Sequence, residues 1–419
     1  MVVAEAKTQT VRIARLGHRG DGIAEVPDGP LYVPLTLPGE RVEILRDGSN
    51  RSRGRMVRLL EASPARTGPV CAHYGECGGC ALQHMKPPAY LAWKRDQIRQ
   101  TLAQRGLEAE VGETIPLKPG TRRRTVFTAT RVNGRSVFGY HARHSHRIVE
   151  VTECPILVPE IASKLKDLAG LVGPIVPSRG EIRVAVTATL TGLDVALEGP
   201  TVRPPALVPL AAPLVKKLGV ARLSIAGEPI LQMTDPVITI GGAAVTMPPL
   251  AFLQAAADAE AAMARLVGEG VGNAKRIADL YAGVGTFALR LAKQARVLAV
   301  EGEGAALEAL AQAAKRTPRL KAVETLKRDL ARMPLSPEEL KGYGAVVFDP
   351  PRAGAAAQCE QIARSRVPRI IAVSCNPATL ARDLRILVDG GYRIDKVTPV
   401  DQFLFSPHIE AVALLTREK

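Results

Sequence analysis

Three cysteines lie within the ten residues 71–80, CAHYGECGGC, in a chain of 419 residues that has only six. The spacing Cys71-x5-Cys77-x2-Cys80 supplies three thiolates, and the fourth candidate ligand is Cys154, which a proline follows in VTECPIL. Four sulfur ligands suit a 4Fe–4S cluster or a tetrahedral zinc ion. We favour the cluster, with zinc as the alternative, because a second zinc knuckle is missing and the glycines of CGGC let backbone N–H groups approach the sulfurs. Three unligated thiols so close together would oxidise.

A glycine-rich segment, DLYAGVGTF at residues 279–287, follows one predicted strand and opens a predicted helix. Its glycines let the backbone approach a ligand where a side chain would collide. Glu301 ends the next predicted strand, where a carboxylate suits the diol of a ribose. The segment also fits G-x-G-x-x-A, so it indicates a nucleoside cofactor without distinguishing NAD from S-adenosylmethionine.

A further cysteine, Cys375, comes directly after the apolar strand RIIAVS, and a helix is predicted from about Pro377. A strand–turn–helix junction places the sulfur at the ligand-binding end of a parallel sheet, and the positive helix terminus is expected to lower its pKa. The alternative is a small buried core cysteine, to which we assign Cys359. For Cys375 the flanking Asn-Pro and its position favour a nucleophile.

The elements that position these residues fall into three predicted domains. Residues 1–62 contain five short strand-like runs with turn signals, which predict a small OB-like barrel. Residues 63–250 predict a mostly β domain, with a helix at 88–107 as a candidate for packing on the catalytic domain. Residues 251–419 alternate strands and helices, which predicts a doubly wound α/β sheet that binds ligands at the carboxyl ends of its strands.

The charge of the chain is +15, and it is unevenly distributed. Residues 115–149 hold eight Lys or Arg and no Asp or Glu, including Arg122, Arg123 and Arg124, and a second basic cluster lies at Arg46–Arg58. Such a concentration of positive charge indicates a surface that binds the phosphate backbone of a nucleic acid, although a generally basic surface is the simpler alternative. No signal peptide or membrane span is apparent, so a cytoplasmic protein with reduced thiols is expected.

The order of these motifs resembles the iron–sulfur members of the RNA (uracil-5-)methyltransferase family. The resemblance rests on CAHYGECGGCALQHM, TRRRTVFTATR, ECPIL and SCNP, and it covers nearly the whole chain. DGIAEVPDGPLYVPLTLPGERVEI resembles the TRAM domain, an RNA-binding barrel, although a barrel that only packs on its neighbour is an alternative. DPPRAG at 349–354 is similar to the family's D-P-x-R loop, and Arg352 argues against the amino-methyltransferases, which carry an aromatic residue there.

The resemblance implies a Rossmann-like methyltransferase domain that transfers a methyl group from S-adenosylmethionine to carbon 5 of a uridine. It implies that Cys375 adds to carbon 6 of the base and that Glu410, in SPHIEAVALL, is the general base; a solvated strand-end glutamate is the alternative for Glu410. Thr286 replaces an Asn that is common in the family, and DQFLFSPH lacks its usual Phe-Pro. By the same resemblance, the cofactor site would be lined by Gln254, Tyr281, Thr286, Glu301, Asp329 and Asp349.

The predicted partner is RNA whose target uridine is unpaired or flipped out, with Arg122–Arg124 and the barrel on its phosphates. The barrel and cluster favour ribosomal RNA over tRNA, and we expect a monomer with no membrane contact. No step of the reaction moves an electron, so we expect the cluster to organise RNA-facing loops. The alternatives from other classes are an iron–sulfur oxidoreductase using flavin or nicotinamide, and a non-catalytic RNA-binding protein.

Overall fold

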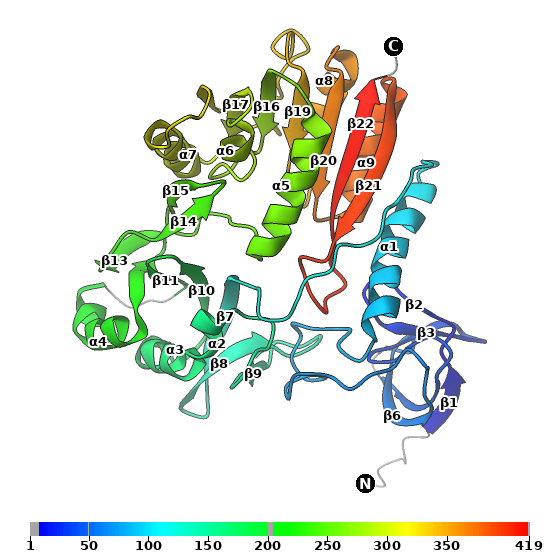
Figure 1. Ribbon diagram of the computed structural model, residues 1–419. Helices are drawn as coiled ribbons and strands as arrows, with labels where there is room; N and C mark the ends of the chain where they lie inside the picture. The colour runs from blue at the N-terminus through cyan, green and yellow to red at the C-terminus, as the bar shows by residue number, and fades with distance from the viewer. Residues whose placement is uncertain (1–7, 49, 200–203, 418–419) are drawn as a thin grey trace.

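The structure is a computed structural model that describes residues 8–48, 50–199 and 204–417 (Figure 1). The prediction that the N-terminus lacks a signal peptide concerns in part residues 1–7, which lie outside these ranges. Within them, no helix is both long and apolar enough to cross a membrane.

The N-terminal strands form two three-stranded sheets, in the orders β1-β5-β6 and β2-β3-β4. Their inward residues, among them Val11, Leu31, Val42 and Ile44, are buried in one small core. The first predicted strand is interrupted at residues 13–14, which gives two strands instead of one. The bounds are β1 (Thr8–Arg12), β2 (Arg15–Leu16), β3 (Gly22–Val26), β4 (Gly29–Val33), β5 (Arg41–Arg46) and β6 (Gly54–Glu61).

The central part of the chain is built on one seven-stranded sheet with the order β13-β12-β11-β10-β7-β8-β9. Three helices pack with its apolar face in a second core. The elements are β7 (Arg124–Val132), β8 (Arg135–His141), β9 (Ile148–Glu150), α2 (Pro159–Ala162), α3 (Leu165–Val172), η1 (Gly173–Ile175), β10 (Glu181–Thr189), β11 (Gly192–Glu198), α4 (Pro204–Leu218), β12 (Val220–Ile225) and β13 (Glu228–Gln232).

The hairpin β14 (Val237–Ile240) and β15 (Ala243–Thr246) forms a separate two-stranded sheet. Its residues Ile238, Ile240 and Val245 share a core with Val284 and Leu289 of the C-terminal part. The hairpin is therefore attached to the body that the sequence places after residue 250.

The C-terminal part is a seven-stranded sheet with the order β18-β17-β16-β19-β20-β22-β21. The first five strands of this order are parallel, as predicted, but β22 runs antiparallel between β20 and β21. The predicted helix at 287–295 is only one turn long. The elements are α5 (Ala257–Val271), β16 (Arg276–Leu280), α6 (Ala288–Leu291), β17 (Arg296–Glu301), α7 (Gly304–Arg316), β18 (Val323–Lys327), β19 (Ala345–Phe348), α8 (Ala356–Arg364), β20 (Arg369–Ser374), α9 (Pro377–Asp389), β21 (Tyr392–Val400) and β22 (Glu410–Arg417).

Helices cover both faces of this sheet, so it forms the middle of three layers. Helices α5, α6 and α7 pack on one face, and α8 and α9 on the other. The strand order reverses between β16 and β19, which is where such sheets bind ligands. As the sequence indicates, Cys359 of α8 is fully buried in the core.

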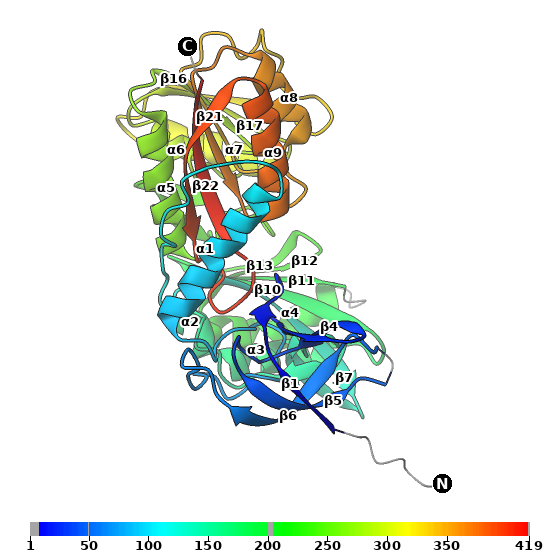
Figure 2. The same cartoon turned by 90° about the vertical axis from the view of Figure 1, so that its right-hand side faces the viewer.

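The helix α1 (Pro87–Ala103) completes the second face, although it precedes the central sheet in the chain. Its residues Ile98 and Leu102 are buried in the same core as α9 and β21. It runs from the N-terminal sheets to the catalytic-domain helix α9 (Figures 1 and 2). The helix expected at residues 88–107 ends at Ala103 and packs on α9 and β21.

Candidate active site

The antiparallel course of β22 brings Cys375 and Glu410 to the same edge of the sheet. Cys375 follows the last residue of β20, Ser374, which pairs with Ala411 of β22. Glu410 is the first residue of β22, and it is almost fully buried. Residues distant in sequence thus meet beside the carboxyl ends of β16 and β19, and both line one cavity of about 1040 Å³.

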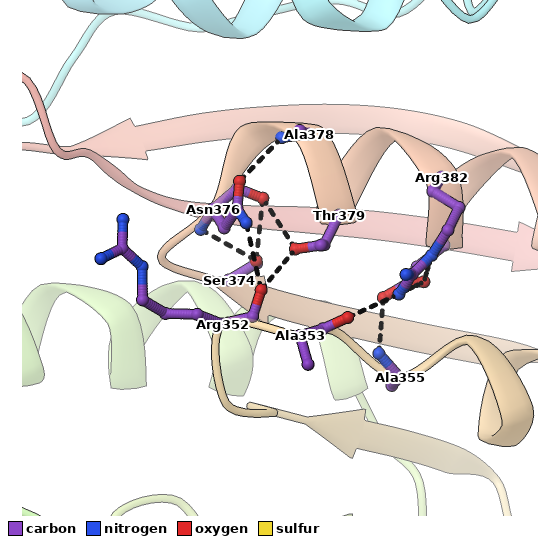
Figure 3. Close-up of polar contacts among 9 residues, drawn as sticks. Arg352, Ala353, Ala355, Ser374, Asn376, Ala378, Thr379 and Arg382 are labelled. Atoms are coloured by element: carbon purple, nitrogen blue, oxygen red, sulfur yellow. Dashed lines mark hydrogen bonds and ion pairs between the residues drawn. The ribbon is translucent and has the colours of Figure 1, made fainter. Parts of the chain in front are cut away.

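The turn that carries Cys375 is held by polar contacts to the DPPRAG loop (Figure 3). Asn376 caps α9, since its Oδ1 accepts from the backbone N of Ala378 at 3.1 Å. Its Nδ2 donates to the carbonyl oxygen of Arg352 at 3.1 Å, and the Thr379 hydroxyl donates to the same oxygen at 3.3 Å. The Arg352 side chain points away from this network (Figure 3) and lines the cavity.

A chain of buried side chains connects Glu410 to Asp349. Gln402 donates from Nε2 to Glu410 Oε2 at 2.9 Å and to Gln254 Oε1 at 2.7 Å. Gln254 in turn donates from Nε2 to Asp349 Oδ2 at 2.8 Å. Sequence reasoning did not single out Gln402, and its signal would have been a polar residue in an otherwise apolar segment before the last strand.

Burial and neighbouring carboxyl groups set the protonation of this site. Burial, together with repulsion of the thiolate by Glu410 and Asp349, raises the pKa of Cys375 to about 11. Burial likewise raises the pKa of Asp349 to about 7, and that of Glu410 well above its ordinary range. The expectation that the α9 terminus lowers the pKa of Cys375 is therefore wrong for this structure, because desolvation and two nearby carboxyl groups outweigh it.

The glycine-rich segment makes the opposite wall of the cavity. Tyr281, directly after β16, has a φ of 60°, a strained conformation for a residue that is not glycine. Glu301 Oε2 accepts from the backbone N of Gly283 at 2.9 Å, so the carboxylate braces the turn. At Gly285 a Cβ would lie 2.9 Å from the side chains of Leu289 and Leu310, so only glycine fits without movement.

The structure brings together most of the residues expected at a cofactor site. Five of the six line the cavity: Gln254, Tyr281, Glu301, Asp329 and Asp349. Thr286 is not among the lining residues, and its carbonyl oxygen accepts from Arg290 at 2.6 Å inside the protein. Thr286, which replaces the Asn common in the family, therefore does not line the cavity.

The four clustered cysteines also belong to the lining of this cavity. Cys71, Cys77, Cys80 and Cys154 all line it. Burial, together with the neighbouring thiols Cys77 and Cys71, raises the pKa of Cys80 to about 11. The backbone N of Gly79 donates to Cys77 Sγ at 3.4 Å, as the glycines of CGGC predict. Among the described residues, however, no group of three or more His, Cys, Asp or Glu side chains is arranged to hold a metal ion, so a metal centre is not shown.

The arginine run Arg122–Arg124 lies where the central sheet contacts helix α5 of the C-terminal part. Arg123 is 12% exposed and forms an ion pair with the buried Glu260 of α5 at 2.6 Å. It is therefore unsuited to RNA phosphates, contrary to the expectation from charge. Arg122 and Arg124 line the cavity, and the Arg124 guanidinium lies over the ring of Phe252, 5.3 Å from its centroid.

The fold and this site define a methyltransferase. Over 97% of this chain and 100% of the other, the structure resembles the tRNA (uracil-54, C5)-methyltransferase of Pyrococcus abyssi crystallised with S-adenosyl-L-homocysteine, with a TM-score of 0.73 and 23% identity. A family model described as tRNA (Uracil-5-)-methyltransferase matches residues 246–418.

Two curated relatives match nearly the full length. An uncharacterized RNA methyltransferase of Brucella suis is 47% identical over 99% of both chains. The 23S rRNA (uracil(1939)-C(5))-methyltransferase RlmD of Chromohalobacter salexigens is 33% identical over 99% of this chain and 90% of that protein. The chain belongs to the RNA (uracil-5-)methyltransferase family, and its glycine-rich turn is therefore not a sign of a nicotinamide enzyme.

Proposed function

We propose that the protein transfers a methyl group from S-adenosylmethionine to carbon 5 of a uridine in RNA, through a covalent bond between Cys375 and carbon 6 of the base. One observation carries the proposal. The pairing of β20 with β22 brings Cys375 and Glu410 to the same edge of the sheet, where both line one cavity. Family membership supports the reaction type.

The geometry suits a reaction in two stages. Carbon 5 of uracil is too weak a nucleophile by itself, so Cys375, once its thiol proton has been lost, adds as the thiolate to carbon 6 and makes carbon 5 an enolate carbon. Bound S-adenosylmethionine supplies the electrophilic methyl group. Glu410 then removes the proton from carbon 5, and the bond from Cys375 to carbon 6 breaks, which releases the methylated base. The buried position of Glu410 keeps water from the carboxylate during this step.

The cofactor is proposed to lie along the ends of β16, β17 and β19. Glu301 is placed for the ribose hydroxyls, and Tyr281 and Asp349 lie on the two sides of the strand-order reversal. Gln254 and Asp329 complete the proposed wall.

Substitution of the two reacting residues tests the scheme. RNA carrying 5-fluorouridine cannot lose a proton from carbon 5, so the wild-type protein with methyl donor should become trapped on it as a slow band on a denaturing gel. Cys375→Ala should abolish both trapping and methylation while RNA binding persists. Glu410→Gln should accumulate an adduct with ordinary RNA. Failure of the wild-type protein to be trapped would refute the covalent scheme.

We further propose ribosomal RNA as the substrate, because a relative that matches nearly the full length, RlmD of Chromohalobacter salexigens, is named as a 23S rRNA enzyme. The TRAM-like assignment of β1–β6 agrees with this choice. Mapping 5-methyluridine in total RNA from a deletion strain tests it. Loss of the modification from tRNA instead would reverse the choice.

We also propose that Cys71, Cys77, Cys80 and Cys154 hold a structural 4Fe–4S cluster. Support comes from their convergence on one cavity and from the N–H donated to Cys77. Zinc sites built from cysteines usually use two C-x2-4-C knuckles, and this sequence has no second knuckle. Zinc is therefore the weaker alternative.

Metal content distinguishes these possibilities. Protein purified without oxygen should contain about four iron atoms and four acid-labile sulfides per chain. Cys154→Ser should lower both, whereas Cys359→Ser, at the buried cysteine outside this group, should not. One zinc per chain, or no metal at all, would contradict the proposal.

A further inference from the structure

The loop before Glu410, residues 401–409, is held in place from outside the catalytic sheet. It connects β21 to β22, and within it Phe405 has a φ of 59°, a strained conformation for a residue that is not glycine. The loop makes few backbone hydrogen bonds of its own. Its conformation therefore depends on the groups around it.

Lys94 of α1 provides the main support for this loop. Its side chain is fully buried, and its Nζ donates to Asp401 Oδ1, to the carbonyl oxygen of Phe403 at 3.1 Å and to that of His408 at 2.7 Å. A lysine ammonium has three N–H donors, so all of them are used on this loop. The contacts join its beginning to its end, directly before Glu410.

A second residue of α1 fixes the middle of the loop. The Tyr90 hydroxyl donates to Asp401 Oδ1 at 2.8 Å and accepts from the backbone N of Phe405 at 2.8 Å. The carbonyl oxygen of Phe405 accepts from the backbone N of Ala81 at 2.7 Å and of Leu82 at 3.0 Å. The strained residue is thus bound on both sides.

The consequence reaches the base through Gln402. This residue lies between Asp401 and Phe403, both of which Lys94 binds, and its Nε2 donates to Glu410 at 2.9 Å. Displacement of the loop would move Gln402 and with it the hydrogen bond that orients the Glu410 carboxylate. Cys375 lies on another turn, which Asn376 caps and binds to the carbonyl oxygen of Arg352, and the Arg352 side chain lies 3.3 Å from His408 Nδ1 of the loop.

We propose that Lys94 is a positioning residue for the proton-abstraction step, because it closes the 401–409 loop and so holds Gln402 and Glu410 in place. The proposal rests on the proposed function, in which Glu410 is the base. Because Lys94 has no contact with Cys375, its loss should slow resolution of the covalent adduct far more than its formation.

The test uses full-length protein, ordinary uridine RNA and S-adenosylmethionine, with the adduct followed over time on denaturing gels. Lys94→Met combined with Asp401→Asn removes both buried charges together, which avoids leaving one unpaired. We expect resolution at least about tenfold slower and formation within about twofold of wild type. Tyr90→Phe should likewise slow adduct resolution more than adduct formation. It tests the proposal if the double variant does not fold.

A matched control removes another buried ion pair. Arg222 and Asp194 pair at 2.7 Å in the central sheet, away from the loop. Arg222→Met with Asp194→Asn should change stability but not the ratio of the two rates. If formation and resolution slow together in the Lys94 variant, or resolution is unchanged, the proposal is overturned. Trapping of the wild-type protein by 5-fluorouridine RNA shows separately whether the covalent scheme holds.

Discussion

The carboxyl groups of Glu410 and Asp349 influence the reactivity of Cys375 before any substrate arrives. A sulfur whose pKa is about 11 is a thiol at neutral pH, and thiols are poor nucleophiles. The resting site therefore resists alkylation and oxidation. Removing one of these carboxyl groups should make the thiolate easier to form, because its ionised form repels the sulfur anion.

This charge effect predicts the pH dependence of alkylation. Because the pKa of Cys375 is raised, the thiolate fraction should still increase with pH beyond 9, without a plateau there. Iodoacetamide labelling of the Cys375 peptide, followed by mass spectrometry between pH 7 and pH 10, measures this increase. In Glu410→Gln the labelling should rise more steeply toward pH 10 than in the wild-type protein and be about threefold faster or more there, since the ionised Glu410 carboxylate repels the thiolate.

Glu301→Gln is the matched control, because Glu301 lines the same cavity but braces the glycine turn. It should label at the wild-type rate. A plateau below pH 9 in the wild-type protein would show that its thiol ionises more easily than this environment allows.

The chemistry-bearing residues were predictable from sequence because each lies directly after an apolar strand or in a short, recognisable motif. The interactions among them were not. Gln402 belongs to no motif. Its importance depends on hydrogen bonds that connect it to Gln254 and, through Gln254, to Asp349. The protonation of Cys375 was mispredicted because the helix terminus is visible in sequence, whereas burial is not.

At the scale of elements, the decisive feature is the direction of β22. A parallel last strand would place Glu410 at the far edge of the sheet, whereas the antiparallel strand places it beside Cys375. Strand positions could be predicted from apolar runs, but this direction could not, because it follows from tertiary pairing between β20 and β21. The same holds for the hairpin β14–β15, whose partners lie in another part of the chain.

The seam between the central sheet and α5 gives a second prediction at this scale. Arg123 and Arg290 share the buried Glu260, at 2.6 and 2.7 Å. Arg123→Met should lower the free energy of unfolding by about 2 kcal/mol, because one partner of a buried charge is lost while Arg290 remains. Urea denaturation followed by circular dichroism measures the change.

The adjacent Arg122 is the natural control. Its Nε donates only to the carbonyl oxygen of Arg124 at 3.0 Å, and its side chain lines the cavity. Arg122→Met should weaken RNA binding with little loss of stability. Equal effects of the two substitutions on RNA binding would mean that Arg123 leaves its ion pair to reach the RNA.

At the scale of the whole molecule, the positive charge is only partly available to a polyanion. In the N-terminal basic cluster, Arg46, Arg53 and Arg58 each approach an acidic side chain within 4 Å. Arg51, before β6, and Arg55, on β6, are both exposed. If this face follows RNA phosphates, these two residues should contribute most of its electrostatic binding.

Salt dependence measures that contribution. Arg51→Ala with Arg55→Ala should lower the slope of log Kd against log salt by about 1.4, at about 0.7 for each phosphate contact on single-stranded RNA. Lys315→Ala with Arg316→Ala removes the same charge from exposed positions of α7 and should leave the slope unchanged. An equal drop in both variants would indicate a diffuse field rather than a defined face.

The packing of α1 on α9 and β21 also constrains the order in which the protein matures. This helix is synthesised before its partners α9 and β21, which are complete only nearly three hundred residues later. Its apolar face stays unpaired with them until then. The strand β22, which begins with Glu410, is made more than three hundred residues after α1. The enzyme therefore cannot gain activity piece by piece, and a fragment beginning at residue 251 would expose the surface that Ile98 and Leu102 cover and would be prone to aggregate.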